Sequence, residues 1–356
     1  MDGVGKVSLS FYRDKKVFVT GHTGFKGSWL CRALVLAGVN VTGYALAPET
    51  KPALFELLGL KNDMKSVIAD IRDYKALLKS LKKSKPEIIF HMAAQPLVRE
   101  SYKNPVYTYE TNVMGTVNFL EACRYIPGAR SIVNVTTDKV YENREMNRAF
   151  KEDEPLNGFD PYSNSKSCSE LVTSSYRNSF YSAKGAVAVS TARSGNVIGG
   201  GDFAADRIIP DCVRALKAGK PVVVRNPGAV RPYQHVLDCI SGYLLLAEKQ
   251  YDAGLSGSYN FGPDKSDVVD NAALVELFLD AWGGGSRVHR HDNGPHEARF
   301  LRLDCSRAKK ILGWKPRMKI GEAVGLTAEW SRAYLDKSGH AACVDRQINE
   351  YFGKGL

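Results

Sequence analysis

The sequence predicts an α/β protein with a doubly wound parallel sheet and a smaller α/β lobe. Three observations support this prediction. Short apolar and β-branched runs alternate with helical patterns along the first half of the chain, and a glycine-rich turn joins the first run to the first helical pattern. After Asn196 the apolar runs become short and are separated by proline and glycine. Strands and helices that alternate in this way form parallel sheets covered on both faces.

Each element of the alternation has a local sequence signal. The expected strands, in chain order, are residues 15–20, 39–46, 65–70, 87–94, 131–137 and 185–193. One helical pattern closes at Gly38, two others contain "YKALLKSLKK" and "TYETNVMGTVNFLEACRY", and a fourth begins near Asp160. Glycine commonly ends a helix and an Asp-Pro pair commonly begins one, so these boundaries have a physical cause.

The turn after the first strand predicts a dinucleotide site. It places three glycines at Gly-x-x-Gly-x-x-Gly spacing between a strand and a helix, where backbone can approach a pyrophosphate and the helix N-terminus attracts negative charge. A glycine-rich turn without a ligand is the alternative. The predicted cofactor contacts in this turn are Gly21, His22, Gly24, Phe25 and Gly27, although His22 could instead only cap the turn.

The cofactor predicted for this site is NAD. The second strand ends in "GYALAPE", with no acidic residue placed for an adenosine ribose and no arginine for a 2′-phosphate. The missing acid leaves the choice between NAD and NADP open, and the missing arginine favours NAD. Further predicted contacts follow the third and fourth strands, and they are Asp70, Ile71, Arg72, Ala93 and Ala94.

The second half of the chain is expected to cover the substrate. "GGGDFAADRIIPD" is glycine-rich and then polar, whereas "YQHVLDCISGYLLLAEKQ" is expected to return to the first lobe. The predicted domains are therefore a dinucleotide-binding domain of residues 1–197 and 232–262, and a substrate-binding lobe of residues 198–231 and 263–356.

Composition narrows the classes of partner. Lysine and arginine number 49 against 38 acidic residues, a net charge of +11 that suits nucleic acid, acidic lipid or a phosphate-bearing small molecule. No nucleic-acid motif is present, and the basic run at 75–86 is expected to be the solvated face of a helix. No apolar stretch suits a membrane span or signal peptide, so we expect a cytoplasmic protein. The seven scattered cysteines predict neither a disulfide framework nor a metal site.

The pair Tyr162 and Lys166 is the strongest catalytic signal. Four residues apart, they share one face of the helix that begins near Asp160. A nearby ammonium group stabilises a phenolate, so the tyrosine is expected to accept a hydroxyl proton. Together with the glycine turn, the pair resembles the extended short-chain dehydrogenase/reductase superfamily, which has a Rossmann-type fold. The resemblance implies that Thr137 orients the substrate hydroxyl and that Lys166 also binds the nicotinamide ribose.

Directly after Thr137 stand an acid and a base, Asp138 and Lys139. This triplet resembles that of nucleotide-sugar 4,6-dehydratases, which oxidise carbon 4, eliminate water across carbons 5 and 6, and return the hydride to carbon 6. The resemblance implies that Asp138 is the general acid, with a pKa raised by burial. Lys139 is the provisional carbon-5 base, which requires a neutral amine. A simple ion pair on a strand-end loop is the alternative.

Resemblance to these dehydratases extends over nearly the whole chain. It rests on "FVTGHTGFKGSWL", "DPYSNSKSCSE", "RSGNVIGGGDFAADRIIPD", "RPYQHVLD" and "LRLDCSRAKKILGWKP", and it implies CDP-glucose as the substrate. By the same resemblance, Asn196 and Arg231 hold the diphosphate and Arg207 lies near the nucleotide. His296 is expected to touch the base or ribose. His91 is expected to pack at a strand end.

Three rival functions stay open from the sequence. They are a 4,6-dehydratase for a UDP-linked N-acetyl sugar, a nucleotide-sugar epimerase or reductase, and a non-catalytic dinucleotide sensor. The resemblance also implies a homodimer or homotetramer, paired through the helices that contain residues 111–125 and 163–176.

Overall fold

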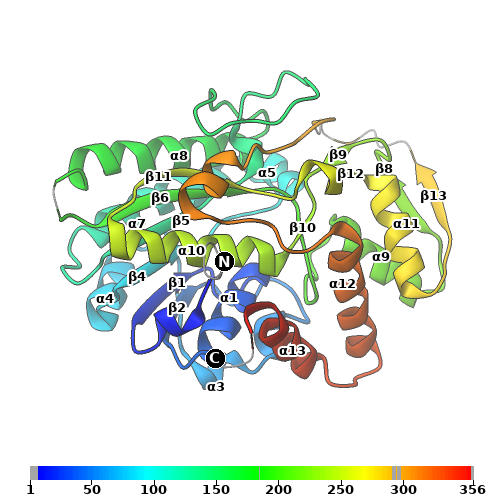
Figure 1. Cartoon of the computed structure of the whole chain (residues 1–356), viewed down its shortest axis with the longest axis horizontal. Coiled ribbons are helices and arrows are strands. Elements are labelled where there is room, and N and C mark those ends of the chain that lie inside the picture. The colour runs from blue at the N-terminus through cyan, green and yellow to red at the C-terminus, as the bar shows by residue number, and fades with distance from the viewer. Residues whose placement is uncertain (1–6, 184, 291–293, 295–297, 354–356) are drawn as a thin grey trace.

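A seven-stranded parallel sheet forms the centre of the molecule (Figure 1). The computed structural model describes residues 7–183, 185–290, 294 and 298–353. The strand order is β11-β6-β5-β4-β1-β2-β3. Their bounds are β1 (Lys16–Thr20), β2 (Asn40–Ala45), β3 (Lys65–Ile68), β4 (Ile88–His91), β5 (Ser131–Val135), β6 (Ala188–Ser194) and β11 (Gly257–Phe261). The predicted fold class is therefore confirmed. Each of the six predicted strands is present; five are shorter than predicted, and β6 begins three residues later and ends one residue later.

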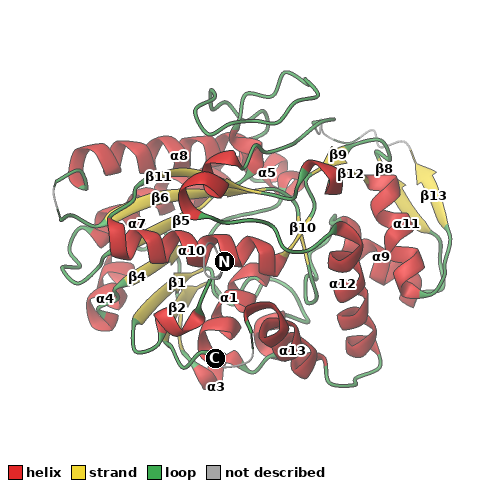
Figure 2. Cartoon of the chain, viewed as in Figure 1, coloured by secondary structure: helices red, strands yellow, loops and turns green. Residues whose placement is uncertain are grey.

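Alternating side chains along the strands build one core layer on each face of the sheet. Val17 and Val19 of β1 pack in the same cluster as Trp29 of helix α1 (Phe25–Leu36) and Leu237 of helix α10 (Val236–Ala253). Phe18, between the two valines, belongs instead to the opposite cluster. The helices over that second face are α4 (Tyr74–Ser84), α7 (Gly115–Cys123) and α8 (Pro161–Phe180). Strands in Figure 2 accordingly run between helices.

The helix predicted around residues 108–125 is interrupted. It consists of α6 (Pro105–Tyr109), a π-helical turn η2 (Glu110–Met114) and α7. Asn112 in the π turn accepts a hydrogen bond from the backbone N–H of Gln95 at 2.9 Å and donates to the Gln95 carbonyl at 3.1 Å. A wider turn therefore lets Asn112 hold the loop that follows β4, which helical periodicity alone does not predict.

The remaining elements lie outside the main sheet. Those within residues 208–225 and 271–290 lie together on the right of Figure 1. The helices are α2 (Leu54–Leu57), α3 (Leu60–Asp63), α5 (Val98–Lys103), α9 (Ile208–Lys217), α11 (Asn271–Trp282), α12 (Ile320–Leu335) and α13 (His340–Phe352). Three two-stranded ladders pair β7 (Val197–Ile198) with β10 (Gln234–His235), β9 (Val230–Arg231) with β12 (Val269–Asp270), and β8 (Val222–Arg225) with β13 (Arg287–Arg290). Short 3₁₀ or π turns are η1 (Leu9–Tyr12), η3 (Asp138–Val140), η4 (Lys265–Asp267) and η5 (Ala308–Leu312).

A third buried cluster lies away from the sheet. It joins α9, α11 and α12 through side chains that include Ile209, Phe278 and Val324. Helix α10 lies against β5 and β6 of the main sheet. The domain boundaries proposed from the sequence stay a prediction. Among the residues that the structure describes, no helix has both the length and the apolar character needed to cross a membrane.

Candidate active site

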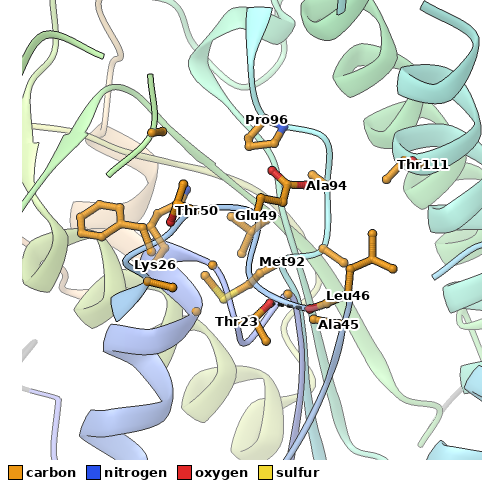
Figure 3. A pocket seen from close by; sticks show the side chains of 18 of the residues that line it. Thr23, Lys26, Ala45, Leu46, Glu49, Thr50, Met92, Ala94, Pro96 and Thr111 are labelled. Atoms are coloured by element: carbon orange, nitrogen blue, oxygen red, sulfur yellow. Dashed lines mark hydrogen bonds between the residues drawn. The ribbon is translucent and has the colours of Figure 1, made fainter. Parts of the chain in front are cut away.

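The carboxyl ends of β1, β2 and β4 form the first wall of a cleft, which we call the cofactor wall (Figure 3). Gly21 there has a φ of +74°, and a Cβ on it would meet the backbone of Met92 and Ala93 at 2.7 Å. A Cβ on Gly27 would lie 2.1 Å from the Gly21 carbonyl oxygen. Glycine is therefore required at these positions by the close approach of the backbone. The other predicted cofactor residues on this wall are Gly24, Phe25, Asp70, Ile71, Ala94, Tyr162 and Lys166.

Two predicted cofactor residues do not line this cavity. The His22 side chain is buried beneath the turn, where its Nε2 lies 2.7 Å from Ser66 Oγ and burial lowers its pKa to about 4. Arg72 pairs instead with Asp70 and Glu110, each at 2.8 Å. His22 thus supports the turn from below, and Arg72 orients Asp70 at the rim.

A second cavity adjoins the first. Its wall, which we call the acid–base wall, contains the Thr137-Asp138-Lys139 triplet together with Asn196 and Arg231. Six residues line both cavities, so the two form neighbouring parts of one cleft, and these six are Lys26, Pro96, Thr136, Tyr162, Asp202 and Arg207. This arrangement brings the predicted hydroxyl, tyrosine, lysine and acid residues to one place.

Asp138 has the environment that a general acid requires. Its side chain is 1% exposed, and its Oδ1 accepts a hydrogen bond from Thr137 Oγ1 at 3.1 Å. None of the described residues donates a hydrogen bond to its Oδ2. Burial raises the pKa of Asp138, whereas Lys139, Thr137 and Arg231 oppose that rise. Burial therefore favours the protonated form of the carboxyl group, and its buried Oδ2 has no hydrogen-bond donor among the described residues.

Helix α8 positions the catalytic tyrosine and lysine. The helix begins at Pro161 because Asp160 caps it, accepting hydrogen bonds from the Ser163 backbone N–H at 2.9 Å and the Ser163 hydroxyl at 2.6 Å. Lys166 is buried, and its Nζ donates to the Val135 carbonyl at 3.2 Å. The end of β5 and this helix are thereby joined at the cleft.

Burial, rather than the charge of Lys166, has the largest effect on the pKa of Tyr162. Burial raises the pKa of Tyr162 to about 12, and the Thr137 hydroxyl and Arg207 oppose that rise. Burial also lowers the pKa of Lys166 to about 7, and the charge of Lys26 lowers it further. Near neutral pH the Lys166 amine is thus only partly protonated, which weakens its hold on a phenolate.

The predicted phosphate-binding residues lie around the second cavity. Arg231 is buried, with Nη1 donating to the Val230 carbonyl at 2.9 Å. Arg207 precedes α9 and pairs with Asp202 at 2.9 Å. Asn196 follows β6, and its carbonyl accepts a hydrogen bond from the Gln234 backbone at 3.0 Å. The predicted His296 lies outside the described residues.

Sequence reasoning missed two charged residues at the cleft. Lys26, within the quoted glycine turn, lines both cavities, and burial lowers its pKa. Glu49 was judged to lie past the cofactor site, but it lines the cofactor wall (Figure 3), where burial and the charge of Glu100 raise its pKa. A lysine between the second and third glycines of the turn is the signal that singles out Lys26. His91 is buried and stacks on Phe119 with ring centroids 4.3 Å apart.

Comparison with known proteins assigns the family. A model of the GDP-mannose 4,6-dehydratase family matches residues 18–327. The chain belongs to this family. A curated CDP-glucose 4,6-dehydratase from Salmonella typhimurium is 46% identical over 97% of this chain and 98% of its own length. A dTDP-glucose 4,6-dehydratase from Streptomyces antibioticus is 32% identical, covering 89% of this chain and 92% of the relative.

Solved structures of a dehydratase and of an epimerase share the fold of this chain. A dTDP-glucose 4,6-dehydratase from Streptomyces venezuelae, solved with NAD bound, superposes with a TM-score of 0.78 at 26% identity. The match covers 90% of this chain and 98% of that one. A UDP-glucose 4-epimerase from Thermotoga maritima superposes equally well at 22% identity, which shows only the shared fold. This member of the GDP-mannose 4,6-dehydratase family is a nucleotide-sugar 4,6-dehydratase, a hydro-lyase.

Proposed function

We propose that the chain uses NAD to convert CDP-glucose into CDP-4-keto-6-deoxyglucose. The observation that carries the reaction type is Asp138, a buried acid in the same cavity as Thr137 and Tyr162, whose Oδ2 is bonded by none of the described residues. Epimerases and reductases of this fold move only a hydride and need no such acid. The substrate choice is supported by the 46% identical CDP-glucose 4,6-dehydratase.

The cofactor wall suits NAD in shape and donor groups. Gly27 leaves no room for a Cβ, so the turn between β1 and α1 is shaped for backbone contact with a pyrophosphate. Asp70 and Ile71 line the end expected to take the adenine, and Tyr162 and Lys166 line the end expected to take the nicotinamide ribose. NAD would also be held by Gly21, Gly24, Phe25, Ala93 and Ala94.

Each residue of the cleft then has one role in the reaction. When bound, NAD accepts the hydride from sugar carbon 4, returns it to carbon 6, and through its positive ring favours the Tyr162 phenolate. Tyr162 takes the proton of the 4-hydroxyl, which Thr137 orients. Lys166 holds the ribose and, when protonated, stabilises the phenolate. Oxidation at carbon 4 makes the carbon-5 hydrogen acidic, which prepares the elimination.

Elimination requires one group that gives a proton and one that takes it. Asp138, biased towards its protonated form, donates to the departing hydroxyl of carbon 6. Lys139, half-buried on the acid–base wall, removes the carbon-5 proton and gives a proton back to carbon 5 when the hydride returns to carbon 6. Asn196 and Arg231 hold the diphosphate, since a guanidinium group matches phosphate oxygens in geometry and charge, and Arg207 lies near the nucleotide.

The deciding experiment is an incubation of purified protein with CDP-glucose and no added electron acceptor. We expect a 4-keto sugar with no net NADH, because the hydride returns to the product. Net NADH would indicate a dehydrogenase instead. Turnover of a UDP-linked N-acetyl sugar or another nucleotide sugar in place of CDP-glucose would keep the chemistry and reject the substrate.

The proposal includes a second copy of the chain and a biosynthetic setting. Segments α6 to α8 expose large apolar side chains on one region, which is typical of an interface, and these are Tyr109, Met114, Tyr125, Leu171 and Phe180. A homodimer, or a tetramer of two dimers, would cover them.

Working in the cytoplasm, the enzyme would supply deoxysugars for lipopolysaccharide O-antigen.

A further inference from the structure

A buried carboxylate lies one helical turn beyond Lys166. Glu170 of α8 is 2% exposed and lines neither cavity. Its Oε1 accepts a hydrogen bond from Thr136 Oγ1 at 2.5 Å, and its Oε2 accepts from Thr191 Oγ1 at 2.7 Å. Arg193 of β6 completes the set, because its Nη2 donates to Oε2 at 2.8 Å. One carboxylate thus joins α8 to two neighbouring strands of the sheet.

Arg193 also contacts the far end of the segment that begins at Thr136. Its Nη1 donates to the Tyr141 hydroxyl at 2.8 Å and to the Glu152 carbonyl at 3.0 Å. Thr136 and Tyr141 are the two ends of residues 136–141, the segment that contains the Thr137-Asp138-Lys139 triplet. A single buried ion pair therefore holds both ends of the acid–base segment.

Between those ends, α8 also reaches the segment through Ser167 Oγ, which donates to the Val140 carbonyl at 2.7 Å, and through Tyr162, which interacts with the Thr137 hydroxyl. Burial alone would raise the pKa of Glu170, but Arg193 and the two threonine hydroxyls reverse the shift and hold it below its ordinary value. The carboxylate is therefore ionised, and hydrogen bonds to a charged acceptor are stronger than those between neutral groups.

We propose that Glu170 and Arg193 are positioning residues for the elimination step. The pair fixes the segment that carries Asp138 against the helix that carries Tyr162 and Lys166. Oxidation depends on groups of the helix, and elimination depends on groups of the segment. The ion pair therefore fixes the position of the elimination groups relative to the oxidation groups. This inference rests on the proposed function, but it concerns residues that touch neither substrate nor cofactor.

Two threonines bonded to the same carboxylate provide a matched test. Thr136→Val removes the hydroxyl on the acid–base segment, and Thr191→Val removes the corresponding hydroxyl on β6, outside that segment. Both variants lose one buried hydrogen bond to Glu170, so a merely structural role predicts similar effects from both. Because Thr136 also lines the cleft, a positioning role predicts an effect on the reaction both from Thr136→Val and from Tyr141→Phe, which lies outside both cavities, and none from Thr191→Val.

The first measurement is amide hydrogen exchange in the protein without substrate. We expect residues 137–140 to exchange at least about tenfold faster in Thr136→Val than in Thr191→Val. The second measurement is a single-turnover reaction with CDP-glucose, in which the absorbance of NADH is recorded over time. For Thr136→Val we expect transient bound NADH and a kcat lowered at least about tenfold, because a small misplacement of a catalytic group is costly. Thr191→Val is expected to stay within about twofold of wild type.

Equal exchange and equal turnover in the two valine variants would overturn the proposal. Should Thr136→Val fail to fold, Tyr141→Phe tests the other end of the segment with the same two measurements. Glu170→Gln gives an independent check, because its side chain lies outside both cavities, and it should also accumulate NADH. Failure of the wild-type protein to convert any nucleotide sugar would instead reject the proposed function, while the exchange measurement would still report on the ion pair.

Discussion

The two walls of the cleft owe their shapes to different kinds of residue. The cofactor wall is shaped by missing side chains, since Gly21 and Gly27 let backbone segments approach where a Cβ would collide. The acid–base wall is shaped by ionisable side chains, among them Asp138, Lys139 and Arg231, held in place by neighbours. Adding an atom to the cofactor wall should therefore weaken NAD binding and stability, and removing a functional group from the acid–base wall should lower kcat.

The largest expected effect is on the acid–base wall. Asp138→Asn keeps the size of the side chain but removes the proton that elimination needs. We expect kcat to fall by a factor of about 10²–10⁴, with oxidation still occurring, so that enzyme-bound NADH accumulates. Stopped-flow absorbance with CDP-glucose measures both quantities. Asp153→Asn, at an exposed position, is the control, and turnover of Asp138→Asn at the wild-type rate would show that no acid acts at this residue.

On the cofactor wall, Gly27→Ala should act by excess volume. The added methyl group would lie 2.1 Å from the Gly21 carbonyl oxygen, so the turn must shift. We expect a loss of about 1–3 kcal/mol in the free energy of unfolding and weaker binding of NAD. Denaturant unfolding and fluorescence titration with NAD measure the two effects. Gly128→Ala, where no atom lies within 4 Å of the added Cβ, is the matched control, and equal losses in both variants would contradict this account.

The sequence predicted the cofactor wall better than the acid–base wall, for a physical reason. The glycine spacing is a local pattern, and six of the seven sheet strands could be recognised from apolar runs and turn residues. β11 was not identified individually, because Gly257–Phe261 lies in the region of short, mixed segments. Asp138, Tyr162 and Lys166 were found through two short motifs, and the structure places them at one cleft.

What the sequence could not predict depends on contacts between distant segments. The direction of the His22 side chain is set by Ser66, which is 44 residues away. The π turn in the helix before residue 115 follows from the bonds of Asn112 to Gln95. The pKa of Tyr162 depends on burial, which spacing along a helix does not report. Such features become visible only once the chain has folded.

The smallest expected effect concerns Lys166, which lines the cofactor wall. Its pKa in the folded protein is about 7, against an ordinary value of 10.5. Between these values the unfolded chain binds more protons than the folded one, so this group makes the folded state more stable as pH rises. Lys166→Met removes that contribution. From about pH 7 to about pH 9, the free energy of unfolding of wild type should therefore rise relative to the variant by roughly 2 kcal/mol. Guanidinium unfolding at a series of pH values measures the difference, and exposed Lys79→Met should run parallel to wild type. If Lys166→Met also runs parallel to wild type, burial does not perturb the ionisation of Lys166, and the low pKa assigned to this group on the cofactor wall is wrong.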